Sequence, residues 1–236
     1  MTWFGNFYRS AIGKKAVMAV TGVILFGFVL IHMLGNLKVY FPKHESAKDP
    51  TVMVWPLNEY GAFLREVGAP LVPHESLLWV ARLILLAAVV LHIWAAYQVT
   101  MMSRAARPIA YHGRQFVEAS YASRTMRWGG VILLLFIIYH ILHFTTGQAH
   151  PDFIHGDPYH NFVVGFRVWW VSAFYILANL ALGLHLYHGV WSMFNSLGLN
   201  HPKFNAWKRT FATAFAVIIT VGNVSFPLAV LIGIVR

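Results

Sequence analysis

Six of the thirteen histidines stand inside long apolar stretches of the chain, where an ionisable side chain is costly and usually has a function. These six residues are His32, His92, His140, His143, His185 and His188. They occupy four separate stretches, and none of those stretches contains Asp, Glu or Lys. Since a proton or sodium pathway normally uses carboxylates at that depth, the pattern disfavours an ion-coupled transporter.

Imidazoles on facing helices are typical axial ligands of a b-type haem, which is held without covalent attachment. One histidine from each of four helices would supply the four ligands that two haems need. The alternative is that these histidines only form hydrogen bonds between helices. His140 and His143 are three residues apart, as are His185 and His188, so each pair shares a helix face and spacing does not choose between members. Small residues near these positions would let a flat macrocycle approach the backbone: Gly35, Ala88, Ala95, Gly129, Gly130, Gly183 and Gly189.

The composition requires a bilayer around these helices. Of 236 residues, 58% are hydrophobic and 11% are charged, against about 25% charged in an ordinary soluble domain. A multidomain soluble enzyme and a disordered chain are both excluded. Cysteine is absent, which rules out disulfides, thiolate zinc sites, iron–sulfur ligation and covalent c-type haem in this chain.

Five stretches are long and apolar enough to cross about 30 Å of hydrocarbon. The sequence therefore predicts an all-α fold, a single membrane domain over residues 1–236 built as an integral bundle of five transmembrane helices. The first stretch is expected to be retained, because it is too long for a signal peptide and no small-residue cleavage site follows it. The expected helices cover about 14–38, 75–103, 122–147, 165–198 and 207–235, with a proline-containing outer loop over 39–74.

Basic residues are distributed unevenly over the connecting loops. One side carries eleven Lys and Arg against the single acid Glu118, and the other mixes seven basic with seven acidic residues. The positive-inside rule predicts a cytoplasmic N-terminus and a C-terminus outside. A nucleic-acid partner is not expected, since the net charge of +10 is explained by this asymmetry.

At 1.5 Å per residue, His32 lies about 25 Å from Lys15 in the outer half, and His185 about 27 Å from Arg167 in the inner half.

Four motifs give the chain a family resemblance along its whole length. They are Ser10-Ala-Ile-Gly-Lys-Lys15, His32-Met-Leu-Gly-Asn-Leu37, His140-Ile-Leu-His-Phe144 and Gly183-Leu-His-Leu-Tyr-His-Gly-Val-Trp-Ser192. The sequence resembles the five-helix, di-haem cytochrome b anchor of succinate:quinone oxidoreductases, the succinate dehydrogenase and fumarate reductase complexes of bacteria and archaea. The last motif is the most specific.

The resemblance implies two haems b with defined axial ligands. The inner haem iron would be held by His92 and His185, and the outer one by His32 and His140. The anchor would bind an iron–sulfur subunit, itself bound to an FAD-carrying flavoprotein, at the cytoplasmic face of a bacterial or archaeal cytoplasmic membrane. The chain would relay electrons between the iron–sulfur clusters and membrane quinone, with menaquinone expected and ubiquinone the alternative.

Further polar residues are candidates for haem propionates or quinone. Ser10, Lys14 and Arg127 are candidates on the inner side, although each would also serve as an interfacial anchor. The resemblance suggests an acidic residue before the second helix as part of an outer quinone site, and Glu66 and Glu75 stand there, with His74 nearby. Glu66 could equally solvate the outer loop.

Two other kinds of protein share some of these features. One is a haem b anchor of another quinone-linked dehydrogenase, of the hydrogenase or formate dehydrogenase kind, or a free-standing ascorbate-type cytochrome. The other is a haem-free membrane scaffold or transporter. The first kind is expected to arrange its histidines differently over the helices and to lack the Gly183–Ser192 run, and the subunits that co-purify with the chain separate it. In the second kind the histidines would only form hydrogen bonds between helices, and haem content separates it.

Overall fold

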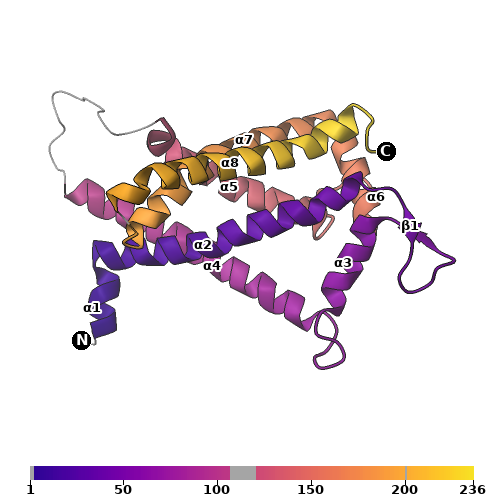
Figure 1. Ribbon diagram of the computed structural model, residues 1–236, viewed down its shortest axis with the longest axis horizontal. Helices are drawn as coiled ribbons and strands as arrows, with labels where there is room; N and C mark the ends of the chain where they lie inside the picture. Colours follow the sequence, from indigo (N-terminus) through magenta and orange to yellow (C-terminus); the bar gives the residue numbers. More distant parts are fainter. Residues whose placement is uncertain (1–2, 107–120, 200) are drawn as a thin grey trace.

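The computed structural model describes residues 3–106, 121–199 and 201–236, and in these ranges the fold is all-α apart from one small hairpin. Five helices are long and apolar enough to cross a membrane, which confirms the predicted number (Figure 1). They are α2 (Ala11–Asn36) with its 3-10 extension η1 (Leu37–Tyr40), α4 (Ser76–Ala105), α5 (Tyr121–Phe144), α7 (Trp169–Ser196) and α8 (Pro202–Leu231).

The two chain ends lie at opposite ends of the bundle (Figure 1). The N-terminal end holds α1 (Trp3–Arg9) and the connection between α7 and α8, whereas the C-terminal end holds α3 (Pro56–Glu66) and α6 (Pro158–Arg167). Arg107, Arg114 and Glu118, which contribute to the predicted orientation, lie outside the described residues. The assignment of these ends to the two sides of the membrane stays a prediction.

The fourth apolar stretch begins later than predicted. A helix over 165–198 was expected, but the backbone is extended at Val168, with φ −76° and ψ 104°, so α6 ends at Arg167 and α7 starts at Trp169. The hydroxyl of Ser172 donates a 2.6 Å hydrogen bond to the Phe166 carbonyl across the break. The two helices thus meet at a stabilised corner, and α6 lies across the C-terminal end of the bundle.

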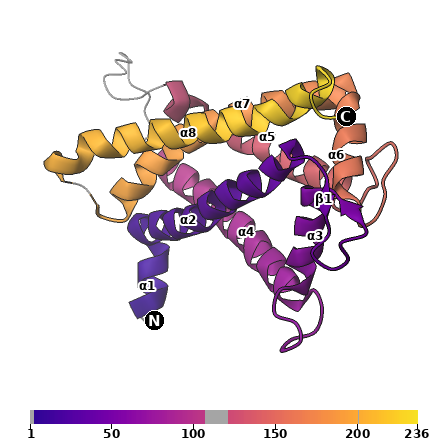
Figure 2. The same cartoon turned by 45° about the vertical axis from the view of Figure 1, so that its right-hand side comes forward.

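The predicted outer loop over 39–74 contains ordered elements. A two-residue pair, β1 (His44–Glu45) with β2 (Met53–Val54), forms an antiparallel hairpin, and α3 follows with Pro56 in its first turn. Glu59 of α3 binds the hairpin through His44 Nε2 at 2.8 Å and the Ala47 amide at 3.1 Å. Figure 2 shows that α3 bridges the diverging ends of α2 and α4.

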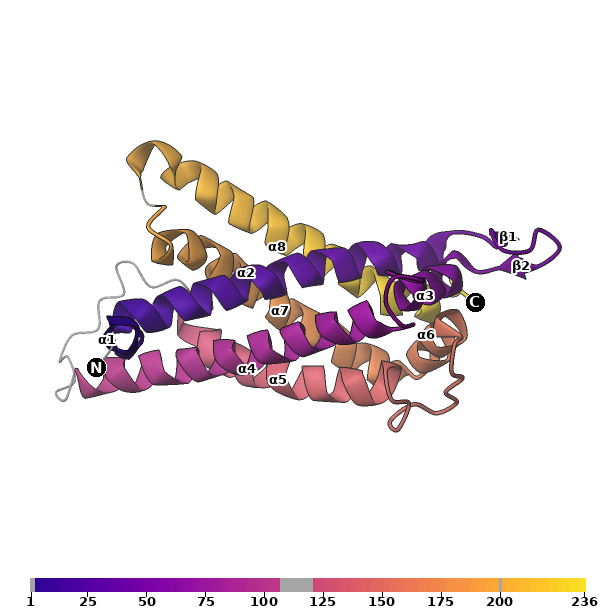
Figure 3. The same ribbon diagram turned by 90° about the horizontal axis from the view of Figure 1, so that it is seen from below.

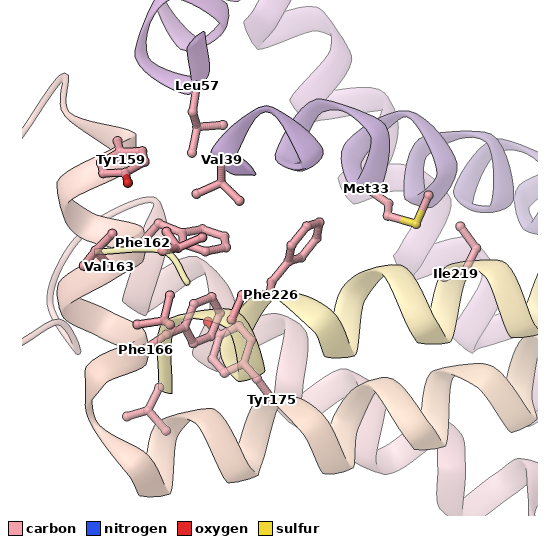
Figure 4. Packing of buried hydrophobic residues seen from close by; sticks show 14 of the residues in the cluster. Met33, Val39, Leu57, Tyr159, Phe162, Val163, Phe166, Tyr175, Ile219 and Phe226 are labelled. Carbon is pink, nitrogen blue, oxygen red and sulfur yellow. The ribbon is translucent and has the colours of Figure 1, made fainter. Parts of the chain in front are cut away.

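The hydrophobic core is concentrated at the C-terminal end, where α2, α3, α6, α7 and α8 meet (Figure 4). Phe162 and Phe166 of α6 pack with Tyr175 of α7 and Phe226 of α8 in edge-to-face pairs. Glycine allows α8 to approach α2, because a Cβ at Gly222 would collide with the side chain of Met33. Small residues at such contacts are typical of helix packing in membranes.

The remaining helices run beside one another and expose large apolar side chains. Figure 3 shows α2, α4, α5 and α7 extending along the same direction. On α4, Leu83 is 60% exposed, and Leu86 and Val90 are exposed to similar degrees. Because such surfaces are unfavourable in water and favourable in lipid, the chain has the character of a multi-pass membrane protein.

Candidate functional site: two histidine pairs in the membrane

The first histidine pair joins α4 to α7. The ring centres of His92 and His185 lie 6.3 Å apart, with the ring planes at 56°. Both side chains are partly buried between apolar helices. Nδ1 of His185 is buried and has no hydrogen-bond partner among the described residues.

Helix α2 orients the ring of His92. Its Nδ1 lies 3.0 Å from the Met18 carbonyl and 3.2 Å from the hydroxyl of Thr21. The Thr21 hydroxyl donates its hydrogen bond to the Val17 carbonyl at 2.8 Å, so its oxygen is free to accept a hydrogen bond from His92. Two acceptors at Nδ1 favour the tautomer that carries its proton there and leaves the Nε2 lone pair available. A metal-binding histidine usually has this arrangement, with its second nitrogen bonded to a carbonyl.

The second pair joins α2 to α5. The ring centres of His32 and His140 lie 5.7 Å apart, and their planes are nearly perpendicular at 89°. Phe28 stacks on the His32 ring with centres 5.2 Å apart. Nδ1 of His140 lies 3.3 Å from the hydroxyl of Tyr175 on α7.

The two pairs lie at different levels along the bundle. On α2, Thr21 contacts His92, and His32 stands eleven residues further along the helix. On α7, Tyr175 contacts His140, and His185 follows ten residues later. At 1.5 Å per residue, both counts place the two histidine pairs roughly 15 Å apart along the bundle. The His92–His185 pair lies toward the N-terminal end and the His32–His140 pair toward the C-terminal end.

Each pair has the spacing of two imidazoles that share one metal ion. Two metal–nitrogen bonds of about 2 Å each place the ring centres of axial imidazoles roughly 6 Å apart. The described residues contain no group of three or more His, Asp or Glu side chains that could hold a metal ion. The candidate donor sets in the described residues are the two histidine pairs.

Three glycines of α5 and α7 have open space where a side chain would stand. A Cβ at Gly129, Gly130 or Gly189 would meet nothing within 4 Å. Gly189 follows His185 by one helical turn on the same face of α7. In contrast, a Cβ at Gly35 would collide with the Tyr60 ring, and one at Gly183 would collide with Thr220. These two glycines therefore serve close packing between chain segments. The spacing of His92 and His185 and the open position of Gly189 fit a planar group at this level.

The two extra histidines have different surroundings. His143 is fully buried, with its ring 4.9 Å from that of His150 and its Nδ1 3.0 Å from the Tyr175 hydroxyl. His188 is partly buried, and its ring lies 6.1 Å from that of Trp191 on the same helix. Among the six histidines of the apolar stretches, ring contacts between different helices pair His32 with His140 and His92 with His185.

The polar candidates at the N-terminal end organise the turn between α1 and α2. Ser10 caps α2 by accepting from the Gly13 amide at 3.0 Å and donates to the Phe7 carbonyl. Lys14 is buried, and its ammonium group donates to the carbonyls of Tyr8 and Arg9 at 3.0 Å each. Both residues thus have a local structural role.

Arg127 lies in the first two turns of α5 and is exposed. Its side chain is therefore accessible at the same end of the bundle as Ser10 and Lys14. The position is suitable for an anionic group at the membrane surface, as an interfacial arginine generally is.

The three quinone candidates line one cleft at the C-terminal end. This cleft has a volume of about 640 Å³ and lies between the end of α3, the start of α4 and the end of α5. Glu66, His74 and Glu75 contribute to its wall together with Arg65, Trp79 and Arg82. Thr145 in the same wall directly follows the end of α5 and comes five residues after His140.

The two glutamates of the cleft are already paired with cations. Glu75 forms an ion pair with Arg65 Nε at 3.3 Å. Glu66 is bound by the Lys48 ammonium group, and this hydrogen bond together with the lysine charge lowers the pKa of Glu66. The lowered pKa makes Glu66 a weaker proton acceptor while Lys48 remains in place.

Several neighbours of the histidines were not predicted from the sequence. They are Thr21 and the Met18 carbonyl beside His92, and Tyr175 beside His140. A tyrosine or threonine inside an apolar stretch carries a polar group that must find a partner, which is the one signal that could have indicated them. Their partners depend on how α2 and α7 pack.

Comparisons of the chain with protein-family models, with curated proteins and with solved structures return no match. The residues and their geometry are therefore the basis for the function proposed below.

Proposed function

We propose that this chain is the di-haem cytochrome b anchor of a succinate dehydrogenase-type complex, relaying electrons between an iron–sulfur subunit and membrane quinone. The observation that carries the proposal is the presence of two histidine pairs, each joining two different helices and separated by roughly 15 Å along the bundle. The motif resemblance described for the sequence supports the same assignment.

The residues present would hold the two groups as follows. His92 and His185 would be the axial ligands of the inner haem, and His32 and His140 those of the outer haem. Haem b supplies reversible one-electron oxidation and reduction when it is bound. Held by two histidines each, the groups would supply electron transfer rather than oxygen chemistry.

The protein would also set the environment of each ligand. The Met18 carbonyl and the Thr21 oxygen hold the Nδ1 proton of His92, which fixes the ring orientation. Gly189, one helical turn from His185, would leave room beside the inner ligands. Apolar side chains around both pairs exclude water and lower the local dielectric constant.

The remaining elements of the proposal concern partners and location. An iron–sulfur subunit with its FAD flavoprotein would bind at the cytoplasmic face, which we assign to the N-terminal end of the bundle because of its basic loops. The membrane would be the cytoplasmic membrane of a bacterium or archaeon. Quinone, with menaquinone expected, would enter either the cleft at Glu66, His74 and Glu75 or a site near Ser10, Lys14 and Arg127.

Two alternative functions keep part of this geometry. A haem b anchor of a hydrogenase or formate dehydrogenase would also use histidine pairs but would bind different soluble subunits. A haem-free scaffold would use the histidines for hydrogen bonds between helices. Haem content distinguishes this second alternative from the proposal.

The test of the complex is affinity purification of the tagged chain from native membranes in mild detergent. We expect a flavoprotein and an iron–sulfur protein to co-purify, and the preparation to reduce a quinone analogue with succinate. Recovery of hydrogenase or formate dehydrogenase subunits would favour the first alternative. Recovery of a folded chain without redox subunits would contradict the proposal.

A further inference from the structure

Tyr175 lies between two histidines of α5. Its hydroxyl is 3.3 Å from Nδ1 of His140 and 3.0 Å from Nδ1 of His143. The ring of Tyr175 is held by the edge of Phe166, with centres 4.9 Å apart, and by the edge of Phe136 at 5.1 Å. Tyr175 is only 4% exposed, so its hydroxyl has little access to other partners.

A hydroxyl has one proton, so it can donate to only one of these two nitrogens. If His140 uses Nε2 to bind a metal ion, its Nδ1 carries a proton and must donate it. The Tyr175 oxygen then accepts from His140, and the Tyr175 proton goes to Nδ1 of His143.

The surroundings of His143 prevent it from replacing His140. Its ring is enclosed by His150 and Tyr139, and a Cβ on Gly165 of α6 would come within 2.8 Å of its Cε1. Nε2 of His143 is buried and has no partner among the described residues. Helix α6 therefore closes the side on which His143 could have reached a ligand.

We propose that Tyr175 is a positioning residue for the outer histidine pair: its hydroxyl fixes the proton of His140 on Nδ1 and binds His143, which makes the two histidines of α5 inequivalent. The inference rests on the proposed function, because it concerns the ligand of the outer haem. A hydrogen-bond acceptor at the ring nitrogen that does not bind the metal makes a ligating imidazole more basic. A more basic ligand stabilises the oxidised metal, so Tyr175 lowers the midpoint potential at this site.

The experiment compares wild type, Tyr175→Phe and Tyr139→Phe in the intact complex purified from membranes. Tyr139 is the matched control, because it lies in the same aromatic cluster and its buried hydroxyl has no partner among the described residues. Redox titration of the haem absorbance gives the midpoint potential of each haem. The His32→Ala variant, which should retain the inner haem alone, identifies which wave belongs to which haem.

We expect Tyr175→Phe to raise the outer potential and leave the inner one unchanged. Loss of the hydrogen-bond partner of a metal ligand typically changes metal affinity by about tenfold or more. A tenfold weaker affinity for the oxidised iron alone raises the midpoint potential by about 59 mV for a one-electron couple. Tyr139→Phe should leave both potentials unchanged. An unchanged outer potential in Tyr175→Phe, or an equal shift in Tyr139→Phe, would overturn the inference.

A second variant covers the case in which Tyr175→Phe does not assemble. His143→Leu should retain both haems, since His143 is bound by Tyr175 and is not a ligand. Loss of the outer haem in His143→Leu would show that His143 is the ligand and would overturn the inference. A wild-type complex without haem would instead refute the proposed function, so the two failures are distinguishable.

Discussion

The rings of His92 and His185 lie with their centres 6.3 Å apart although they belong to different helices, α4 and α7. A second relationship of the same kind links His32 on α2 to His140 on α5 at 5.7 Å. Four of the five membrane-spanning helices thus contribute one histidine each, and each histidine has its partner across a helix interface. This arrangement ties the packing of the bundle to the chemistry proposed for it.

The first prediction concerns the inner pair. His185→Ala should reduce the haem content of the purified complex from two per chain to one, because a single axial imidazole remains at that level. His188→Ala is the matched control: it lies three residues away on the same helix and should retain both haems. The measurement is haem per chain by the pyridine haemochrome assay. Loss of haem in His188→Ala alone would move the ligand from His185 to His188.

The second prediction concerns the outer pair. His140→Ala should remove the outer haem and leave the inner one, as should His32→Ala, and the loss should be visible as the disappearance of one wave in a redox titration. If His140→Ala kept both haems, the ligand on α5 would be His143. Loss of both haems from either substitution would indicate failed assembly, which gel filtration of the complex detects.

The third prediction uses the open space beside Gly189. A Cβ at this position meets nothing within 4 Å, so Gly189→Leu should leave the packing of the chain intact. The larger side chain stands one turn from His185, however, and should lower the occupancy of the inner haem alone. Leu180→Phe, an enlargement at an exposed position of the same helix, should retain both haems. Equal haem content in the two variants would contradict the role given to Gly189.

The fourth prediction concerns stability at the N-terminal end. Lys14→Met should lower the free energy of unfolding by about 1–3 kcal/mol, because it leaves the Tyr8 and Arg9 carbonyls without their shared donor. Lys15 is exposed and is the matched control, so Lys15→Met should have little effect. Thermal unfolding of the complex in detergent measures both. A larger loss of stability in Lys15→Met would contradict the structural role of Lys14.

The membrane-spanning helices could be predicted from the sequence because length and hydropathy determine them locally. The corner at Val168 could not, since a single helix was predicted over 165–198. The break depends on the Ser172–Phe166 hydrogen bond and on packing of α6. Asp157 followed by Pro158 is the local signal for a separate helix, because Asp caps α6 and Pro is suited to its first turn.

The site was predictable in its residue types but not fully in its pairing. Helix rise separated His32 from His185 by depth, whereas the choice of partners for His92 and His140 came from the family resemblance. The contacts that distinguish His140 from His143 depend on Tyr175 and on α6, which approach α5 only in the folded bundle. Spacing along one helix therefore could not supply that choice.

The most direct test of the central claim is the haem content of the purified wild-type complex, measured by the pyridine haemochrome assay with a reduced-minus-oxidised spectrum. We expect two b-type haems per chain, both with low-spin spectra, as two histidines for each haem would produce. One haem per chain would leave one histidine pair with a structural role only. A folded complex without haem would contradict the proposed role in electron transfer.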